Sequence, residues 1–304
     1  MVIHVVQAGE TVNSIAEQYG VSVQRLIYDN QLQEQLQGQP QLQGDLQGGA
    51  RRQALAVGQA LLVLFPQVVH TVEAGDTLEQ IAARYGTTVL ALARNNPFLL
   101  QQNVLLAGQQ IVVFYEEERL GSMRVNGYAY PFIAPAILRE ALLYLDELLV
   151  FSYGFTFSGE LVPPRTNEDW MLEEAGRFGV ESILVLTPFA EPDVFNNQLV
   201  KTVTQDLKVQ QTLIQNLLAK VQEKGYMGVD VDFEYILPED REAYAQFVAN
   251  LNEVMTAQGY RVSVALAPKT SATQPGLLYE GMDYRLLGEN ADSVFLMAYE
   301  WGYT

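Results

Sequence analysis

The chain has 304 residues, of which 49% are hydrophobic, and its 36 acidic and 18 basic side chains give a formal net charge of −18 at pH 7. A surface this acidic repels polyanions, which excludes nucleic acid and anionic membranes as expected partners. The absence of cysteine excludes disulfides, thiol nucleophiles and thiolate-bound zinc. No apolar run reaches the roughly 18 residues of a membrane span, and the opening "MVIHVVQAGET" lacks a cleavable secretory signal. We therefore expect no membrane insertion.

An internal repeat fills the first part of the chain. Residues 4–30, "HVVQAGETVNSIAEQYGVSVQRLIYDN", match residues 70–96, "HTVEAGDTLEQIAARYGTTVLALARNN", at twelve of twenty-seven positions. Each copy predicts a strand, two short helices and a strand, so that residues 2–65 and 67–115 form two small α+β (βααβ) domains. In the second copy Thr77 and Gln80 fit a capping box at a helix start, and Gly86 is a typical helix end.

A Gln- and Gly-rich stretch interrupts the first copy. It reads "QLQEQLQGQPQLQGDLQGGARRQ" at residues 31–53, and it contains the sixteen residues by which the first copy is longer than the second. The stretch is too polar to pack, so we predict a disordered loop.

The two copies resemble LysM modules, because the pattern V-x-x-G-[DE]-T-[LV]-x-x-I-A-x-x-[YF]-G occurs in both. The resemblance implies a groove for N-acetylglucosamine polymers, either peptidoglycan or chitin, beside the turn before the first helix. For Thr11 and Thr77 a purely helix-capping role is equally open. His4 and His70 are expected to be strand-start residues without a catalytic role. Carried over by motif, the expected substrate-binding residues are Gly9, Glu10, Thr11, Gly75, Asp76, Thr77 and Asn96.

From residue 123 onward, strand and helix patterns alternate. Helical patterns are clearest at residues 214–221 and 244–255. Repeated strand-helix units with apolar strands favour a parallel sheet with right-handed crossovers, and a barrel whose chemistry lies at the carboxyl ends of the strands. The predicted strands are residues 124–130, 148–153, 182–187, 228–234, 261–267 and 293–299.

The segment "GYMGVDVDFEY" (residues 225–235) places Asp230, Asp232 and Glu234 at spacing two. A strand would put these three side chains on one face, roughly 6.6 Å apart, where each neighbouring ionised pair repels by about 2.5 kcal/mol. A metal ion, a cationic neighbour, or a proton held by one carboxylate must offset this repulsion, and a held proton is what a general acid needs. The alternative is an edge strand whose acids face water. The apolar residues between the acids argue against it, because they indicate that the other face of the strand is buried.

Two segments carry a second resemblance. "GVDVDFEY" resembles the D-x-x-D-x-D-x-E strand of family 18 glycoside hydrolases, and "LMAYEWG" (residues 296–302) resembles that family's sixth strand. The resemblance implies an α/β fold, a (β/α)8 TIM-type barrel over residues 123–304, that cleaves β-1,4 bonds next to N-acetylglucosamine with no cofactor and no bound metal.

The same resemblance implies roles for individual residues. Glu234 is expected to protonate the glycosidic oxygen and then to activate water. Asp232 is expected to hold the substrate's acetamido N–H, so that the acetamido oxygen attacks the anomeric carbon. Tyr299 is expected to donate a hydrogen bond to that oxygen, and Asp230 to share a proton with Asp232. The residues expected to line the cleft are Glu300 and Trp301.

Three features depart from the family pattern. Met227 stands where the motif has its first Asp, and "LVLTPF" stands where typical chitinases have Ser-x-Gly-Gly. Only six strands are predicted, so we expect a barrel without its last two strands, as in a truncated chain, with lower stability or activity than a complete one.

The order of the domains is similar to that of spore-cortex peptidoglycan N-acetylglucosaminidases, which implies a cell-wall or spore-associated protein in germination or wall turnover. Three alternatives stay open: a chitinase-like hydrolase, a carbohydrate-binding protein that has lost turnover, and a divalent-metal site on the three carboxylates. The sequence does not indicate an oligomeric state.

Overall fold

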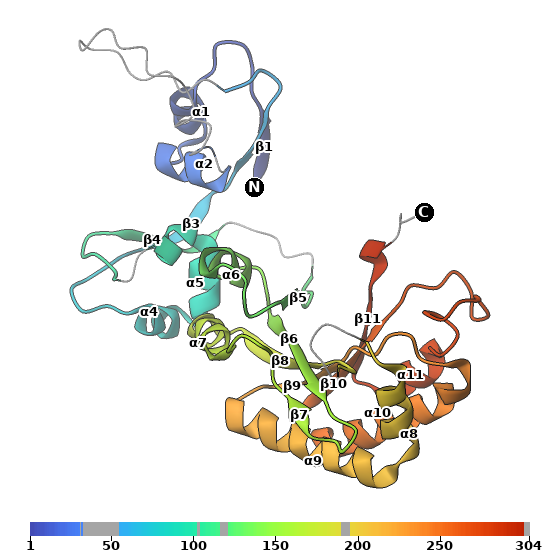
Figure 1. Cartoon of the computed structure of the whole chain (residues 1–304). Coiled ribbons are helices and arrows are strands. Elements are labelled where there is room, and N and C mark those ends of the chain that lie inside the picture. Colours follow the sequence, from blue (N-terminus) through green and yellow to red (C-terminus); the bar gives the residue numbers. More distant parts are fainter. Residues whose placement is uncertain (31, 33–54, 102–103, 116–120, 190–194, 301–304) are drawn as a thin grey trace. The chain divides into compact units, whose positions relative to one another are not determined.

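The computed structural model describes residues 1–30, 32, 55–101, 104–115, 121–189 and 195–300. It divides the chain into two compact units, residues 1–122 and 123–304 (Figure 1). The predicted disordered loop lies outside the described residues, apart from Leu32, which is buried in the core of the first module and so does not belong to a loop in solvent.

The first module joins two strands and two helices around one core. Helix α1 (Val12–Tyr19) begins after the N-cap Thr11 and ends where Gly20 takes a φ of 65°, and helix α2 (Val23–Asp29) follows. Strands β1 (Val2–Val5) and β2 (Ala60–Val63) pair antiparallel. The buried core residues are Val6, Val12, Ile15, Ala16, Leu26, Leu32, Leu61 and Val63.

The second module repeats this plan. Strand β3 (Pro66–Thr71) pairs antiparallel with β4 (Gln110–Tyr115). Helices α4 (Leu78–Tyr85) and α5 (Val89–Asn95) lie between them in the chain, followed by the 3-10 turn η1 (Pro97–Gln101). The predicted capping box is confirmed, because Gln80 N–H donates to Thr77 Oγ1 and the Gln80 side chain accepts from Thr77 N–H. Gly86 ends α4 with a φ of 65°, as predicted.

The second unit is built on a parallel sheet. All six predicted strands are confirmed, with β5, β9 and β11 shorter than expected. A two-residue strand β7 (Leu161–Val162), which the sequence did not indicate, pairs antiparallel with β6. The parallel strands are β5 (Asn126–Ala129), β6 (Glu147–Phe155), β8 (Glu181–Leu186), β9 (Gly228–Val231), β10 (Arg261–Leu266) and β11 (Ser293–Leu296). Their order in space is their order in the chain.

Helices connect these strands and carry apolar faces onto the sheet. Val229 and Val231 of β9 are fully buried, as are Phe247 and Leu251 of α10. The two helical patterns predicted most clearly are confirmed as α9 and α10. The helices of this unit are α6 (Pro135–Leu142), α7 (Asp169–Phe178), α8 (Asn197–Gln205), α9 (Leu207–Lys224), α10 (Arg241–Thr256) and α11 (Tyr284–Asn290).

Over the described residues the sheet is open, with β5 and β11 at its two edges, and it is not a closed eight-stranded barrel. The strands curl across the sheet (Figure 1). At their amino ends, Arg261 donates to Glu147 Oε1 at 2.6 Å and also contacts Glu181. This ion-pair cluster ties β6, β8 and β10 together at the end of the sheet away from the acidic row.

Candidate active site

The acidic row begins on the most enclosed part of the sheet. Strand β9 lies between β8 and β10, where Asp230 is paired with Val185 and Ser263. A Cβ at Gly228 would lie 2.4 Å from the carbonyl oxygen of Arg261, so only glycine allows the two strands to approach here. All four residues of β9 are buried. The alternative of a solvated edge strand is therefore wrong.

Asp230 is held by two hydroxyl donors. Its Oδ2 accepts from Tyr128 Oη at 2.7 Å and its Oδ1 accepts from Ser263 Oγ at 2.5 Å. The carboxylate is completely buried, and this burial raises its pKa above the ordinary value, although both hydroxyl donors oppose the shift. Tyr128 stays protonated, because burial and the neighbouring Asp230 raise its own pKa. The burial of Asp230 thus favours its protonated form more than exposure to water would.

The sequence predicted a strand that continues to residue 234, but strand β9 ends at Val231. Asp232 and Glu234 therefore lie just beyond its end. Asp232 N–H still bonds to Leu186 O at 2.9 Å, so the backbone continues the sheet for one more residue. Phe233 is fully buried and stacks on Tyr244 and Phe247 of α10, at centroid distances of 5.6 and 5.7 Å. Phe233 is thus anchored in the helix layer between the two acids.

The exposure of the acids increases along the row. Asp230 is 0% exposed and Asp232 is 5% exposed, whereas Glu234 is half-buried and can meet a ligand. The next residue, Tyr235, has a φ of 55°. A tyrosine in the left-handed region is unusual, and such backbone strain is concentrated at functional sites. This gradient encloses Asp230 completely and leaves Glu234 as the acid that is accessible from outside.

Tyr299 does not lie in a strand. Strand β11 ends at Leu296, and Tyr299 sits in the 3-10 turn η3 (Ala298–Glu300), 69% exposed. Its ring lies 6.3 Å from that of Phe295, which lies 5.2 Å from the ring of Tyr128. A line of three aromatic rings therefore leads from Tyr299 to the hydroxyl group that binds Asp230.

Glu300 is the last described residue, and the placement of its side chain is outside the description. Trp301, the other residue expected to line the cleft, lies outside the described residues.

Sequence reasoning missed the partners of Asp230. A signal was present for Ser263, a lone polar residue inside the apolar strand "RVSVAL", and for Tyr128 in the short strand "NGYA". Tyr244 was predicted only as a core residue of its helix. Its buried hydroxyl group is close enough to Asp232 and Asp230 for their charges to raise its pKa. A phenol near both acids strengthens the case for a site.

A small aromatic cavity is lined by residues of β6 and by residues that follow β5 and β8. Its volume is about 210 Å³. Phe189 at its edge contacts Phe195 at 4.8 Å between ring centroids, and Phe195 contacts Tyr235 at 5.8 Å. Aromatic side chains thus continue from the cavity to the residue after Glu234. Its lining includes Tyr130, Phe132, Phe151, Arg165 and Phe189.

The expectation that the two histidines begin strands is wrong, because His4 is the third residue of β1 and His70 the fifth residue of β3. His4 Nε2 lies 2.8 Å from Glu10 Oε2 and its Nδ1 lies 3.1 Å from Tyr19 Oη. His70 makes the equivalent contacts, at 2.9 Å to Asp76 Oδ2 and 3.1 Å to the Tyr85 hydroxyl group. Each histidine therefore ties the turn before the first helix to the helix itself.

The acidic residue of each turn faces its own module. The backbone N–H of Gln7 donates to Glu10 at 2.6 Å, and this bond is the main cause of the lowered pKa of Glu10. Glu73 N–H does the same for Asp76 at 2.7 Å. These carboxylates stabilise the turns, and the turn backbone is left as the surface that a glycan could meet.

The remaining expected binding residues divide by their exposure. Gly9 and Gly75 have φ angles of 87° and 93°, which the turn requires and which favour glycine. Thr11 and Thr77 are N-caps. Asn96 is 0% exposed, and its side chain bonds to Leu92 O and to both backbone groups of Val112. Burial places Asn96 out of reach of a ligand, so it is a structural residue.

Comparison with known protein families adds an independent observation. The model of family 18 glycosyl hydrolases matches residues 196–303, which include the whole acidic row. This part of the chain, which carries the acidic row, therefore matches the family 18 glycosyl hydrolases. The LysM domain model matches residues 4–36 and 70–114, so the two repeats are LysM domains.

The proteins that this chain is similar to include enzymes whose names refer to the spore cortex or to sporulation. It is 38% identical over 167 residues to the cortical fragment-lytic enzyme of Bacillus subtilis (strain 168), covering 55% of this chain and 38% of the relative. It is 27% identical over 302 residues to the putative sporulation-specific glycosylase YdhD of the same strain, covering 99% of this chain and 66% of the relative. The crystal structure of the Bacillus cereus spore cortex-lytic enzyme SleL matches with a TM-score of 0.66 and 30% identity, over 99% of this chain and 66% of that one. The chain thus spans at most 66% of the length of these relatives.

Two kinds of feature are absent from the described residues. No helix there is long and apolar enough to cross a membrane. No group of three or more His, Cys, Asp or Glu side chains in the described ranges is arranged to hold a metal ion.

Proposed function

We propose that this chain is a retaining glycoside hydrolase that cleaves β-1,4 bonds at N-acetylglucosamine in peptidoglycan by substrate-assisted catalysis. The observation that carries the proposal is the acidic row that starts at the buried, hydroxyl-bound Asp230 and ends at the half-buried Glu234. The names of the relatives, which describe cortex-lytic enzymes, support peptidoglycan over chitin as the polymer.

The mechanism assigns one step to each acid. Glu234 protonates the glycosidic oxygen and later accepts a proton from water. Asp232 orients the acetamido group, whose own oxygen displaces the leaving sugar. Asp230, with its raised pKa, takes up the proton that relieves charge repulsion along the row. Tyr299, at the end of the aromatic line, donates to the acetamido oxygen.

The LysM domains supply the polymer-binding part of the proposal. Their turns, Gly9–Thr11 and Gly75–Thr77, are held by the histidine contacts and present backbone groups to a glycan. A protein that binds the wall polymer with these domains is expected to act at the cell wall or the spore, in germination or wall turnover. The oligomeric state is not part of the proposal.

The open sheet is further proposed to be the six-stranded part of a (β/α)8 barrel. The parallel order of its strands supports this, as does the hydrogen bond that spans from β5 to β9.

A second candidate function follows from the open edges of the sheet. With β11 at an edge and Tyr299 mostly exposed, the unit could bind a glycan without cleaving it.

Hydrolysis by the native chain and by Glu234→Gln tests the proposal. Release of fluorophore from a fluorogenic N-acetylglucosaminide, abolished in Glu234→Gln, decides for the enzyme. Glu239→Gln, at an exposed acid five residues further along, is the matched control and is expected to keep native activity. Mass spectrometry of products from purified peptidoglycan identifies the bond that is cleaved.

Two results would contradict the proposal. Binding of peptidoglycan without product release in either form favours the glycan-binding candidate. Loss of activity on chelation, restored by a divalent cation, favours metal-activated hydrolysis at the same carboxylates.

A further inference from the structure

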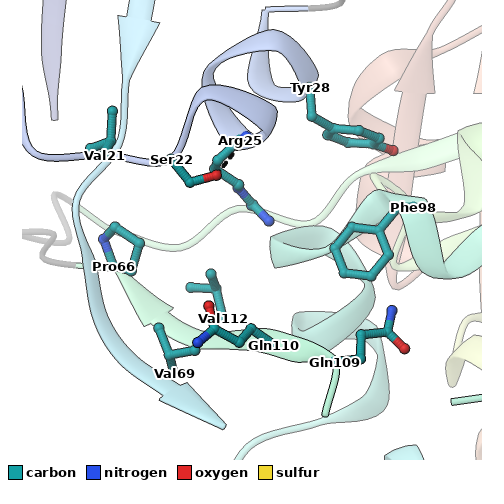
Figure 2. A pocket seen from close by; sticks show the side chains of 10 residues that line it. All are labelled: Val21, Ser22, Arg25, Tyr28, Pro66, Val69, Phe98, Gln109, Gln110 and Val112. Carbon is teal, nitrogen blue, oxygen red and sulfur yellow. Dashed lines mark hydrogen bonds between the residues drawn. The ribbon is translucent and has the colours of Figure 1, made fainter. Parts of the chain in front are cut away.

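A cavity of about 560 Å³ lies between the two LysM domains (Figure 2). One wall comes from helix α2 of the first domain, and the other from strands β3 and β4 and the turn η1 of the second. Its volume is in the range of small-ligand pockets, which are mostly apolar with a few polar groups that fix orientation. The residues on which the argument rests are Ser22, Arg25, Tyr28, Val69, Phe98 and Gln110.

Arg25 is the cation in this cavity, and its charge is already compensated. Its Nε lies 3.0 Å from Asp29 Oδ1, in a pair whose side chains are only 12% and 8% exposed. The guanidinium group also contacts the carbonyl oxygen of Asn95 and lies over the ring of Tyr115. Burial raises the pKa of Asp29, and the charge of Arg25 opposes that shift. Of this pair only Arg25 lines the cavity, and because Asp29 compensates its charge, the cavity attracts an anion weakly and favours a neutral ligand.

Two aromatic rings stand on one flank of the cavity. Tyr28 and Phe98 come from different LysM domains, and their centroids are 6.2 Å apart at an interplanar angle of 88°. Figure 2 shows them on the same side, with Arg25 extending from α2 into the space beside them. A ring face offers an apolar surface to the C–H groups of a sugar, and Gln110 of β4 adds an exposed amide that can both donate and accept.

These side chains are absent from the repeat itself. At the offset of 66 residues, Arg25 corresponds to Ala91 and Tyr28 to Arg94. At the offset of 50 residues, Gln110 corresponds to Ala60. The turns that both copies share, Gly9–Thr11 and Gly75–Thr77, do not line the cavity. The cavity is therefore a feature of the domain pair and is distinct from the turn of each module.

We propose that this cavity binds one neutral N-acetylhexosamine unit of a glycan strand, which makes it a further saccharide site beside the two turns. The unit's C–H face packs on Tyr28 and Phe98, its acetamido oxygen accepts from Arg25, and its hydroxyl groups bond to Gln110. This inference rests on the proposed glycan-binding function of the LysM domains.

Titration calorimetry of the full chain with tetra-N-acetylchitotetraose tests the site. Tyr28→Ala and Gln110→Ala are each expected to weaken the affinity by about fivefold to tenfold, the loss typical of one interface contact. Tyr28→Phe keeps the ring and is expected to bind like the native chain. Tyr144→Ala removes an exposed tyrosine from the other unit and is the matched control. Thermal melting of each variant checks that the domain pair is intact.

Unchanged affinity in both alanine variants overturns the site. Tight binding of an acidic muropeptide together with no binding of the neutral tetrasaccharide overturns the neutral ligand class. Hydrolysis by the native chain is measured separately, so normal hydrolysis with unaffected binding in the variants would remove this inference and leave the proposed enzyme standing.

Discussion

The hydroxyl group of Tyr128 on β5 donates a 2.7 Å hydrogen bond to Asp230 on β9. Strands β6 and β8 separate these two residues within the sheet. Adjacent strands lie about 4.8 Å apart, so a flat sheet would place β5 and β9 about 14 Å from each other. Two side chains cannot span that distance with a hydrogen bond unless the sheet curves. The contact therefore links the curvature of the sheet to the state of the innermost acid.

Tyr128→Phe is expected to lower the free energy of unfolding by about 1 to 3 kcal/mol, the contribution of a hydrogen bond to an ionisable partner. It also raises the pKa of Asp230 further, because a donor that favours the ionised carboxylate is lost. Urea unfolding measures the change in the free energy of unfolding. The raised pKa of Asp230 is expected to reduce kcat, which is measured with a fluorogenic substrate. Tyr144→Phe, at an exposed tyrosine, is the control. Equal stability of both variants would contradict the role of Tyr128.

Asp230→Asn is expected to change how stability depends on pH. The folded-state pKa of Asp230 lies above the ordinary value of 3.8. At pH values between the unfolded pKa and the folded pKa of Asp230, the folded protein binds more protons than the unfolded chain. The stabilisation from this group is therefore present below about pH 4 and is lost as the pH rises through the folded pKa. The variant lacks this titration. Unfolding at several pH values should show its stability improving relative to the native chain as pH rises, and a constant difference would refute the raised pKa.

His70→Ala is expected to loosen the second LysM turn. It removes the contacts of His70 with Asp76 and Tyr85, each a hydrogen bond of about 1 kcal/mol. The melting temperature should fall by several degrees. Retention on insoluble peptidoglycan should also weaken, because the turn Gly75–Thr77 loses the contacts that hold it. His4→Ala should act alike in the first domain. Native retention in both variants would show that the turns do not need the histidines.

Gly228→Ala and Gly176→Ala form a matched pair. A Cβ at Gly228 would meet the backbone oxygen of Arg261 at 2.4 Å, whereas a Cβ at Gly176, exposed on α7, meets nothing within 4 Å. We expect Gly228→Ala to destabilise the unit by about 3 kcal/mol and Gly176→Ala to stabilise it by about 0.5 to 1 kcal/mol. Chemical unfolding of both measures the contrast. Similar values for the two would mean that β9 and β10 can separate without cost.

Local patterns in the sequence determined the elements of this protein. Thr77, Gln80 and Gly86 predicted the start and end of a helix, because caps depend on backbone groups within a few residues. The alternation from Val229 to Phe233 likewise predicted a buried strand with acids on one side. The repeat and the acidic row were enough to indicate both families.

Tertiary structure alone decided which distant groups meet. Tyr128 and Ser263 bind Asp230 from strands 102 and 33 residues away, and no local pattern encodes such a pairing. Burial also distinguished between two residues that the sequence had indicated as site residues. Asn96 is enclosed by its own module, whereas Tyr299 lies beyond the end of its strand and is mostly exposed. The type of a side chain is local, but its solvent access and its partners are set by how the whole chain packs. That is why the sequence could indicate the acids, and only the fold could show how Asp230 is held.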